Sequence, residues 1–145
     1  MLRTKGYYSI TIPEFNNLKV ISVNTQAQND ENWYNLRNPT DPGGMLKWIE
    51  EELKASEAAG QYVYIIGHIP PASALNDWAM RFNALTERYS YNIRGQFYGH
   101  THRDHIGFFP SFADKEKIAA YYLISPSLTT YSNKHPEYRV MTLDY

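Results

Sequence analysis

Short β-branched and aromatic runs recur along this chain and predict strands. The first two, residues 7–12 and 18–23, flank the turn-forming segment PEFNN and predict a hairpin. Residues 24–38 are polar, without a clear period, and predict a long loop of the kind that often carries function. Further runs cover residues 62–66, 95–98, 106–109, 118–124 and 138–143. The pattern therefore predicts about seven strands.

Two stretches have helical spacing. The first carries an apolar stripe, with Trp48 expected in the core, formed by Met45, Leu46, Trp48, Ile49 and Leu53. Asp41 and Pro42 suit the N-cap and N1 positions, and Gly60 suits a stop after Ala59. A second helix is predicted over residues 76–89. Helices that alternate with strands predict an α/β fold, a sandwich with mixed sheets.

Length and composition support one soluble, packed module. The 145 residues, 43% of them hydrophobic and 20% charged, fit one domain over residues 1–145, and the chain shows no linker or internal repeat. Fourteen Lys+Arg against fifteen Asp+Glu give a net charge of -1, so no overall field favours a nucleic-acid partner. Tyrosine is enriched, with 13 residues, and its amphipathic ring suits strands and wet pockets alike.

Targeting and redox signals are absent from the chain. No apolar run approaches the ~20 residues of a transmembrane segment, and the first residues do not resemble a signal peptide. The chain has no cysteine, which excludes disulfides and thiolate metal ligands. This composition fits the cytosol without deciding the compartment, because secreted chains can also lack cysteine.

Two glycine-histidine segments directly follow strand-like runs. His68 follows Gly67 in GHIPP, and His100 and His102 follow Gly99 in GHTH. Ligands tend to sit at strand ends in α/β sheets, and glycine permits a sharp turn or a close approach there. On an extended segment His100 and His102 would point to one side, whereas in a turning loop they could face two adjacent ions. The three histidines together therefore predict a shared metal site.

Each of these residues also has a purely structural interpretation. Any one glycine-histidine pair is more often a surface or hydrogen-bonded histidine than a ligand, and only the combination favours a metal. Asp104 and His105 read better as a solvated strand start, and His135, which precedes a proline in a polar loop, as a surface residue.

Gly67-His68 and the GHTH segment resemble the last two motifs of the calcineurin-like metallophosphoesterases. More of the chain is similar to the C-terminal half of the acid sphingomyelinase branch of that superfamily. The similar segments are residues 6–8, 21–24, 31–33, 40–44 with Leu46 and Trp48, 65–71, 96–102, 125–131 and 136–140. The resemblance implies the C-terminal half of an α/β/β/α sandwich whose active site holds two divalent metal ions, most often Zn²⁺.

By this resemblance, His68 and His100 would bind one metal and His102 the other. The family also uses an Asp-x-His pair, a bridging aspartate and an Asn-His motif, and the Asp-x-His and Gly-Asn-His patterns do not occur in these 145 residues. Three imidazoles cannot complete two coordination spheres. We therefore expect half of an active site, with the catalytic residues and the other ligands in an N-terminal half that this chain lacks.

The implied activity is metal-dependent phosphodiester hydrolysis, as of sphingomyelin to ceramide and phosphocholine at a membrane surface. Asn24 and Tyr131 are candidates for lining the substrate cleft. Two alternatives remain open: hydrolysis of nucleotides or other phosphodiesters, and an inactive metal-binding or interaction module. The resemblance also implies a secreted or lysosomal protein, although members of that branch usually carry disulfides. A half-sandwich is expected to expose apolar surface.

Overall fold

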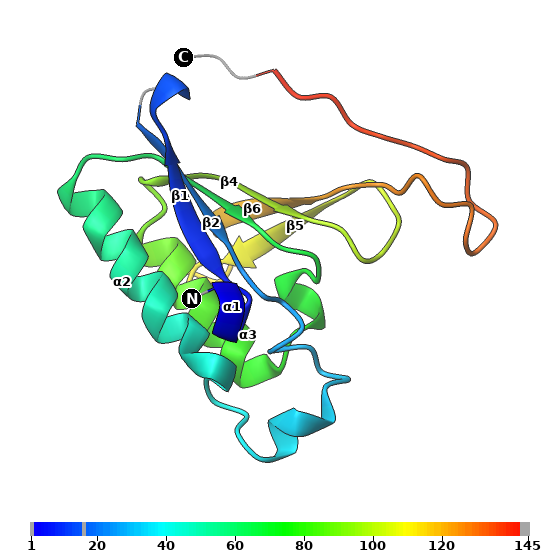
Figure 1. Ribbon diagram of the computed structural model, residues 1–145, viewed down its shortest axis with the longest axis horizontal. Coiled ribbons are helices and arrows are strands. Elements are labelled where there is room, and N and C mark those ends of the chain that lie inside the picture. Colours follow the sequence, from blue (N-terminus) through cyan, green and yellow to red (C-terminus); the bar gives the residue numbers. More distant parts are fainter. Residues whose placement is uncertain (1, 16, 143–145) are drawn as a thin grey trace.

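Among residues 2–15 and 17–142, which the computed structural model describes, six strands form a single mixed sheet in the order β1-β2-β3-β4-β6-β5 (Figure 1). The strands are β1 (Tyr8–Ile12), β2 (Leu18–Ser22), β3 (Val63–Ile66), β4 (Ile93–Tyr98), β5 (His105–Pro110) and β6 (Ile118–Ile124). Together with two long helices they make an α/β fold, as the pattern of the sequence predicted.

The centre of the sheet is parallel and its two edges are antiparallel. β1 and β2 form the predicted hairpin, in which Tyr8 is paired with Ser22 and Ile12 with Leu18. β2, β3, β4 and β6 run parallel to one another, and β5 pairs with β6 in the opposite direction. The carboxyl ends of four strands therefore meet along one edge of the sheet, which is where such sheets usually present ligand sites.

Helices α2 (Met45–Ala58) and α3 (Asn76–Arg88) cover one face of the sheet (Figure 1). Their apolar stripes pack on the strands, and Trp48 is buried as predicted. Trp78 stacks on Phe82 with ring centroids 4.9 Å apart, and Phe82 contacts Phe109 of β5. The core consists of these helix residues and of the strand residues that point toward them, among them Ile21, Val63, Ile65, Tyr98, Tyr122 and Ile124.

The C-terminal end of α2 is close to the predicted one, but Gly44 and not Asp41 occupies its N-cap position, so the predicted N-cap was wrong. The Asp41 carboxylate accepts hydrogen bonds from the backbone amides of Leu46 at 2.8 Å and Lys47 at 3.3 Å. Pro42 does not start α2 itself but begins a single 3₁₀ turn, η3 (Pro42–Gly44), that leads into it. α2 ends at Ala58, one residue before the predicted end, and Gly60 follows in a left-handed conformation.

Short helices occupy several connections. They are α1 (Leu2–Lys5), η1 (Pro13–Phe15), η2 (Trp33–Leu36) and η4 (Pro71–Ser73). η2 lies within the predicted long loop and protrudes from the body of the molecule (Figure 1). None of the helices in the described part of the chain is long and apolar enough to cross a bilayer.

The prediction of a seventh strand over residues 138–143 was wrong. Residues 138–142 form no strand, and Leu143 lies outside the described residues. β5 and β4 already flank β6, so this segment has no ladder to join there. It is held instead by an ion pair between Arg139 and Asp104 and by a hydrogen bond from the Glu137 amide to the Ser127 carbonyl at 2.9 Å.

The face of the sheet opposite the helices carries apolar side chains that remain exposed. Because side chains alternate along a strand, residues adjacent to core positions point to this second face. Its large exposed members, which are 36–56% accessible, come from four strands and are Tyr8, Ile10, Ile66, Ile106, Phe108 and Tyr121. We call them the open sheet face. The described residues thus bury one side of the sheet and leave the other accessible.

Candidate metal centre

Two loops that carry histidine lie side by side at the carboxyl edge of the sheet. The Gly67 amide donates to the Phe97 carbonyl at 3.0 Å, and the Gly99 amide donates to the His68 carbonyl at 2.9 Å. These bonds continue the β3–β4 ladder beyond the strand ends, at Ile66 and Tyr98. The fold therefore brings the two glycine-histidine segments together, although 30 residues lie between them in the sequence.

The imidazoles of His68 and His100 face each other across this edge. Their ring centroids lie 5.4 Å apart, and the ring planes are 85° from parallel. Two imidazoles on one tetrahedral Zn²⁺, with Zn–N distances of ~2.0–2.1 Å, place their centroids ~5 Å apart. The separation of the pair therefore fits two ligands of one metal ion. Both residues are also exposed to solvent, so dissolved ions can reach them.

The backbone of the GHTH segment is bent in an unusual way. His100 has φ of 73° and His102 has φ of 57°, both in the left-handed region that favours glycine. Such conformations cost free energy in residues with a Cβ and concentrate at functional sites. The bend also means that the two imidazoles do not project as they would from an extended segment, which agrees with the turning loop considered from the sequence.

His102 lies beside the C-terminal segment rather than in the His68–His100 pair. Its ring centroid is 6.0 Å from that of Tyr131, the aromatic residue that the sequence suggested for the substrate cleft. The Lys134 ammonium donates to the Thr101 carbonyl at 2.9 Å, and Arg139 pairs with Asp104. The segment after β6 is thus attached along the histidine loop, and it brings Tyr131 and His102 together.

The described residues offer only part of a coordination sphere. No group of three or more His, Cys, Asp or Glu side chains within residues 2–15 and 17–142 is placed to hold a metal ion. The geometry therefore provides a pair of imidazoles that fits one ion and a third imidazole nearby. Any ion bound there would need further ligands.

The other sequence candidates lie outside the His68–His100 ring pair. The Asn24 side-chain amide donates to the Lys5 carbonyl at 3.1 Å, which ties α1 to the end of β2. Asn24 thus has a partner of its own, and the structure does not bring it to the histidine pair through any hydrogen bond. His105 is exposed at the start of β5, Asp104 is engaged with Arg139, and His135 is exposed.

One residue at this edge gave no signal in the sequence. Thr25 is 3% exposed, and its hydroxyl oxygen accepts hydrogen bonds from the backbone amides of His68 at 3.1 Å and Ile69 at 2.8 Å. Threonine in a polar loop carries no pattern that would mark such a role. Only the folded arrangement shows that Thr25 reaches a histidine 43 positions away.

Tyr98 lies buried beneath the same edge. Its hydroxyl donates to the Gln96 side-chain oxygen at 3.2 Å, and burial raises the pKa of Tyr98 far above its ordinary value. Tyr98 therefore stays protonated at neutral pH. Its ring packs close to Gly67, where a methyl group would lie 3.1 Å from Tyr98 Cε1.

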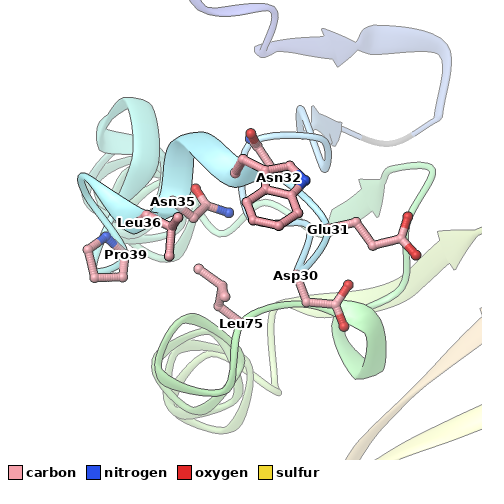
Figure 2. A pocket seen from close by; sticks show the side chains of 8 residues that line it. Asp30, Glu31, Asn32, Asn35, Leu36, Pro39 and Leu75 are labelled. Carbon is pink, nitrogen blue, oxygen red and sulfur yellow. The ribbon is translucent and has the colours of Figure 1, made fainter.

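A pocket of about 720 Å³ opens beside η2 (Figure 2). This volume is in the range of ~300–1,000 Å³ that is usual for small-molecule sites. Its lining combines apolar and acidic side chains and consists of Asp30, Glu31, Asn32, Trp33, Asn35, Leu36, Pro39 and Leu75. Trp33 and Leu36 are more than 80% exposed. The long loop thus forms a concave surface with an apolar wall.

The same loop is attached to the connection that follows His68. Asn29 and Ala74 form an isolated β-bridge, and the Leu75 amide donates to the Gln28 carbonyl at 3.0 Å. Backbone contacts therefore connect the loop that forms the pocket to the segment that follows His68.

Comparison with known proteins gives close relatives over almost the entire chain, although no protein-family model matches it. The chain is 40% identical over 146 residues to sphingomyelin phosphodiesterase from Bos taurus, an alignment that covers 99% of this chain and 23% of the relative. Sphingomyelin phosphodiesterase B from Dictyostelium discoideum is 37% identical to the chain over 151 residues, an alignment that covers 99% of this chain and 23% of the relative.

A third relative has a different named substrate. The chain is 41% identical over 114 residues to cyclic GMP-AMP phosphodiesterase SMPDL3A from Homo sapiens, which covers 72% of this chain and 25% of the relative. The chain thus spans about a quarter of the length of the curated relatives that it matches. This chain is a homologue of one segment of the sphingomyelin phosphodiesterases over nearly its whole length, and of SMPDL3A over 72% of it.

Proposed function

We propose that this chain is part of a metal-dependent phosphodiesterase of the acid sphingomyelinase-like family, which hydrolyses sphingomyelin to ceramide and phosphocholine. Identity of 37–40% to sphingomyelin phosphodiesterases over 99% of the chain supports this function. The structural observation that carries it is the His68–His100 pair, with ring centroids 5.4 Å apart at the carboxyl edge of the sheet.

In this proposal, His68 and His100 hold one divalent metal ion, and His102 contributes to a second. Zn²⁺ is the expected ion because imidazole nitrogen is one of its preferred ligands. When bound, such ions polarise phosphoryl oxygens and lower the pKa of water toward ~7. The chain's own contribution is to orient the imidazoles through the bent GHTH backbone and to place the Tyr131 ring beside His102.

We further propose that residues 1–145 are the C-terminal part of a calcineurin-like catalytic domain, an α/β/β/α sandwich, whose N-terminal part supplies the remaining metal ligands. The open sheet face supports this, since a second sheet would bury its six apolar side chains. The partial ligand set among the described residues agrees with it. A secreted or lysosomal location belongs to the same proposal and rests on resemblance alone.

A second candidate function is hydrolysis of a nucleotide phosphodiester. The similarity to cyclic GMP-AMP phosphodiesterase SMPDL3A, at 41% identity over 114 residues, favours it specifically. The two substrates share the phosphodiester and differ in the groups on either side of it. Rates of the full-length protein on sphingomyelin and on cyclic GMP-AMP, measured side by side, decide between them.

The metal role is tested by substitution of His100 in the full-length protein. We expect His100→Ala to lose zinc and to reduce phosphocholine release by more than the ~10–100-fold typical of outer-shell changes. His135→Ala is the matched control, because His135 is also an exposed histidine but is not one of the proposed ligands. An undiminished rate in His100→Ala would show that this imidazole is no ligand.

The alternative of an inactive metal-binding module makes a different prediction. Such a protein would bind zinc through the same histidines but would release product from neither substrate. Zinc content by elemental analysis, measured on the sample used for the two rates, separates this outcome from a metal-dependent enzyme.

A further inference from the structure

We propose that Thr25 is the positioning residue for His68, an inference that rests on the metal role proposed above. Its hydroxyl oxygen accepts two consecutive backbone amides, those of His68 at 3.1 Å and Ile69 at 2.8 Å. Thr25 follows β2, whereas His68 follows β3. Thr25, at the end of β2, therefore holds the backbone at the end of the neighbouring strand β3.

The opposite side of the His68 peptide is held as well. Its carbonyl oxygen accepts the Gly99 amide at 2.9 Å, which connects His68 to the loop of His100. Thr25 on one side and Gly99 on the other therefore fix the backbone conformation at His68. Only the side-chain torsions remain to place the imidazole, so the direction of the ring depends on these backbone contacts.

The methyl group of Thr25 has a separate role. A methyl group placed on Gly67 would lie 2.7 Å from Thr25 Cγ2, so this methyl group packs closely against the glycine. Thr25 is 3% exposed, and its own amide donates to the Val23 carbonyl at 3.1 Å. The side chain is thus rigidly seated, and its hydroxyl and its methyl group contact the same tight turn.

This rigidity matters because His68 itself is exposed. A solvent-facing imidazole lacks the packing that fixes the rotamer of a buried side chain. Metal ligands must be held close to their coordination geometry, and partners that orient them commonly contribute ~10–100-fold in metal affinity. The hydroxyl of Thr25 is therefore the group in this chain whose loss should loosen His68 without altering any imidazole.

The test compares Thr25→Val, which keeps the shape and removes the acceptor, with Thr25→Ser, which keeps the hydroxyl. In the full-length protein, we expect Thr25→Val to weaken Zn²⁺ affinity by ~10–100-fold. Thr25→Ser should keep a Zn²⁺ affinity within about threefold of wild type, so its loss of affinity should be much smaller than that of Thr25→Val. Affinity is measured by competition with a chromophoric chelator. Ser56→Ala is a control for general destabilisation, since the buried Ser56 hydroxyl donates to the backbone carbonyl of Glu52 within α2.

A second readout does not involve metal. The backbone amides of His68 and Ile69 should be protected from hydrogen exchange in the wild type. Their exchange rates should rise at least about tenfold in Thr25→Val and stay close to the wild-type rates in Thr25→Ser. Unchanged exchange in Thr25→Val, or equal loss of zinc in both variants, would overturn the inference. If the exchange pattern holds while the wild type binds no zinc, the proposed metal role fails and the positioning of His68 stands.

Discussion

The carbonyl oxygen of His68 accepts a 2.9 Å hydrogen bond from the backbone amide of Gly99. This bond joins the two glycine-histidine segments directly, before any metal is considered. Because it extends the β3–β4 ladder, a displacement of either loop is transmitted to the other. The His68–His100 pair is therefore a property of the sheet edge and not of two independent loops.

The two glycines of these segments should respond differently to a methyl group. At Gly67 it would lie 2.7 Å from Thr25 Cγ2 and 2.9 Å from Val23 Cγ2, whereas at Gly99 the nearest atom is His68 Nδ1 at 3.5 Å. Branched residues are stiff at χ1 and cannot yield easily. We expect Gly67→Ala to lower the free energy of unfolding by about 1–3 kcal/mol, the usual cost of overpacking.

Gly99→Ala is the matched control for this prediction. Its methyl group meets only ordinary contacts, so its unfolding free energy should stay within about 0.5 kcal/mol of wild type. Chemical denaturation of both variants measures the difference. Equal destabilisation by the two substitutions would contradict the steric explanation and would point to a shared backbone requirement instead.

The open sheet face should make the isolated chain associate. Its six apolar side chains lie on β1, β3, β5 and β6 and are 36–56% exposed, and large exposed apolar patches promote association. We expect concentration-dependent oligomers in size-exclusion chromatography with light scattering. The double variant Ile10→Lys with Phe108→Lys should shift them toward monomer, because a charge on this face opposes burial.

Trp33→Lys serves as the control for that experiment. Trp33 is 84% exposed but lies on η2, away from the open sheet face. Its replacement should leave the association unchanged. A wild-type chain that stays monomeric over the whole concentration range would show that the open sheet face is tolerated in water.

The charge on Glu52 should make stability depend on pH. Burial by itself raises the pKa of Glu52, but hydrogen bonds from Lys19 and Ser9 and the attraction of Lys19 outweigh it and lower the pKa below its ordinary value of 4.5. The Lys19 ammonium lies 2.7 Å from the carboxylate, and the Ser9 hydroxyl lies 2.9 Å from it. A lowered pKa means that the folded state favours the ionised carboxylate.

The stabilisation is therefore present above pH 4.5 and is lost as the pH falls through the lowered value of the folded state. We expect Glu52→Gln to cost about 1 kcal/mol at pH 7 and to approach wild-type stability in acid. Glu50→Gln is the control, since the Glu50–Lys54 pair is exposed and should contribute less. Denaturation curves at several pH values measure the stability of both variants. A difference between Glu52→Gln and wild type that persists in acid would show that the charge of Glu52 is not the cause.

Much of the fold could be predicted because its signals are local. The hairpin follows from two apolar runs around a turn, and the ends of α2 follow from the acceptor at Asp41 and the left-handed Gly60. The wrong prediction of a seventh strand shows that local signals are not sufficient. The composition of residues 138–142 permits a strand, but a strand also needs a free neighbour in the sheet, and β6 has none to offer.

The sequence by itself determined the types of element, their approximate ends and the presence of three histidines after strand-like runs. Only the tertiary structure decided that His68 and His100 face each other, that His102 lies with Tyr131, that Asn24 is engaged by Lys5, and that Thr25 holds the His68 backbone. The reason is physical. Propensity, capping and periodicity act over a few neighbouring residues, whereas a hydrogen bond between residues 43 positions apart exists only after the sheet has set the order and register of its strands.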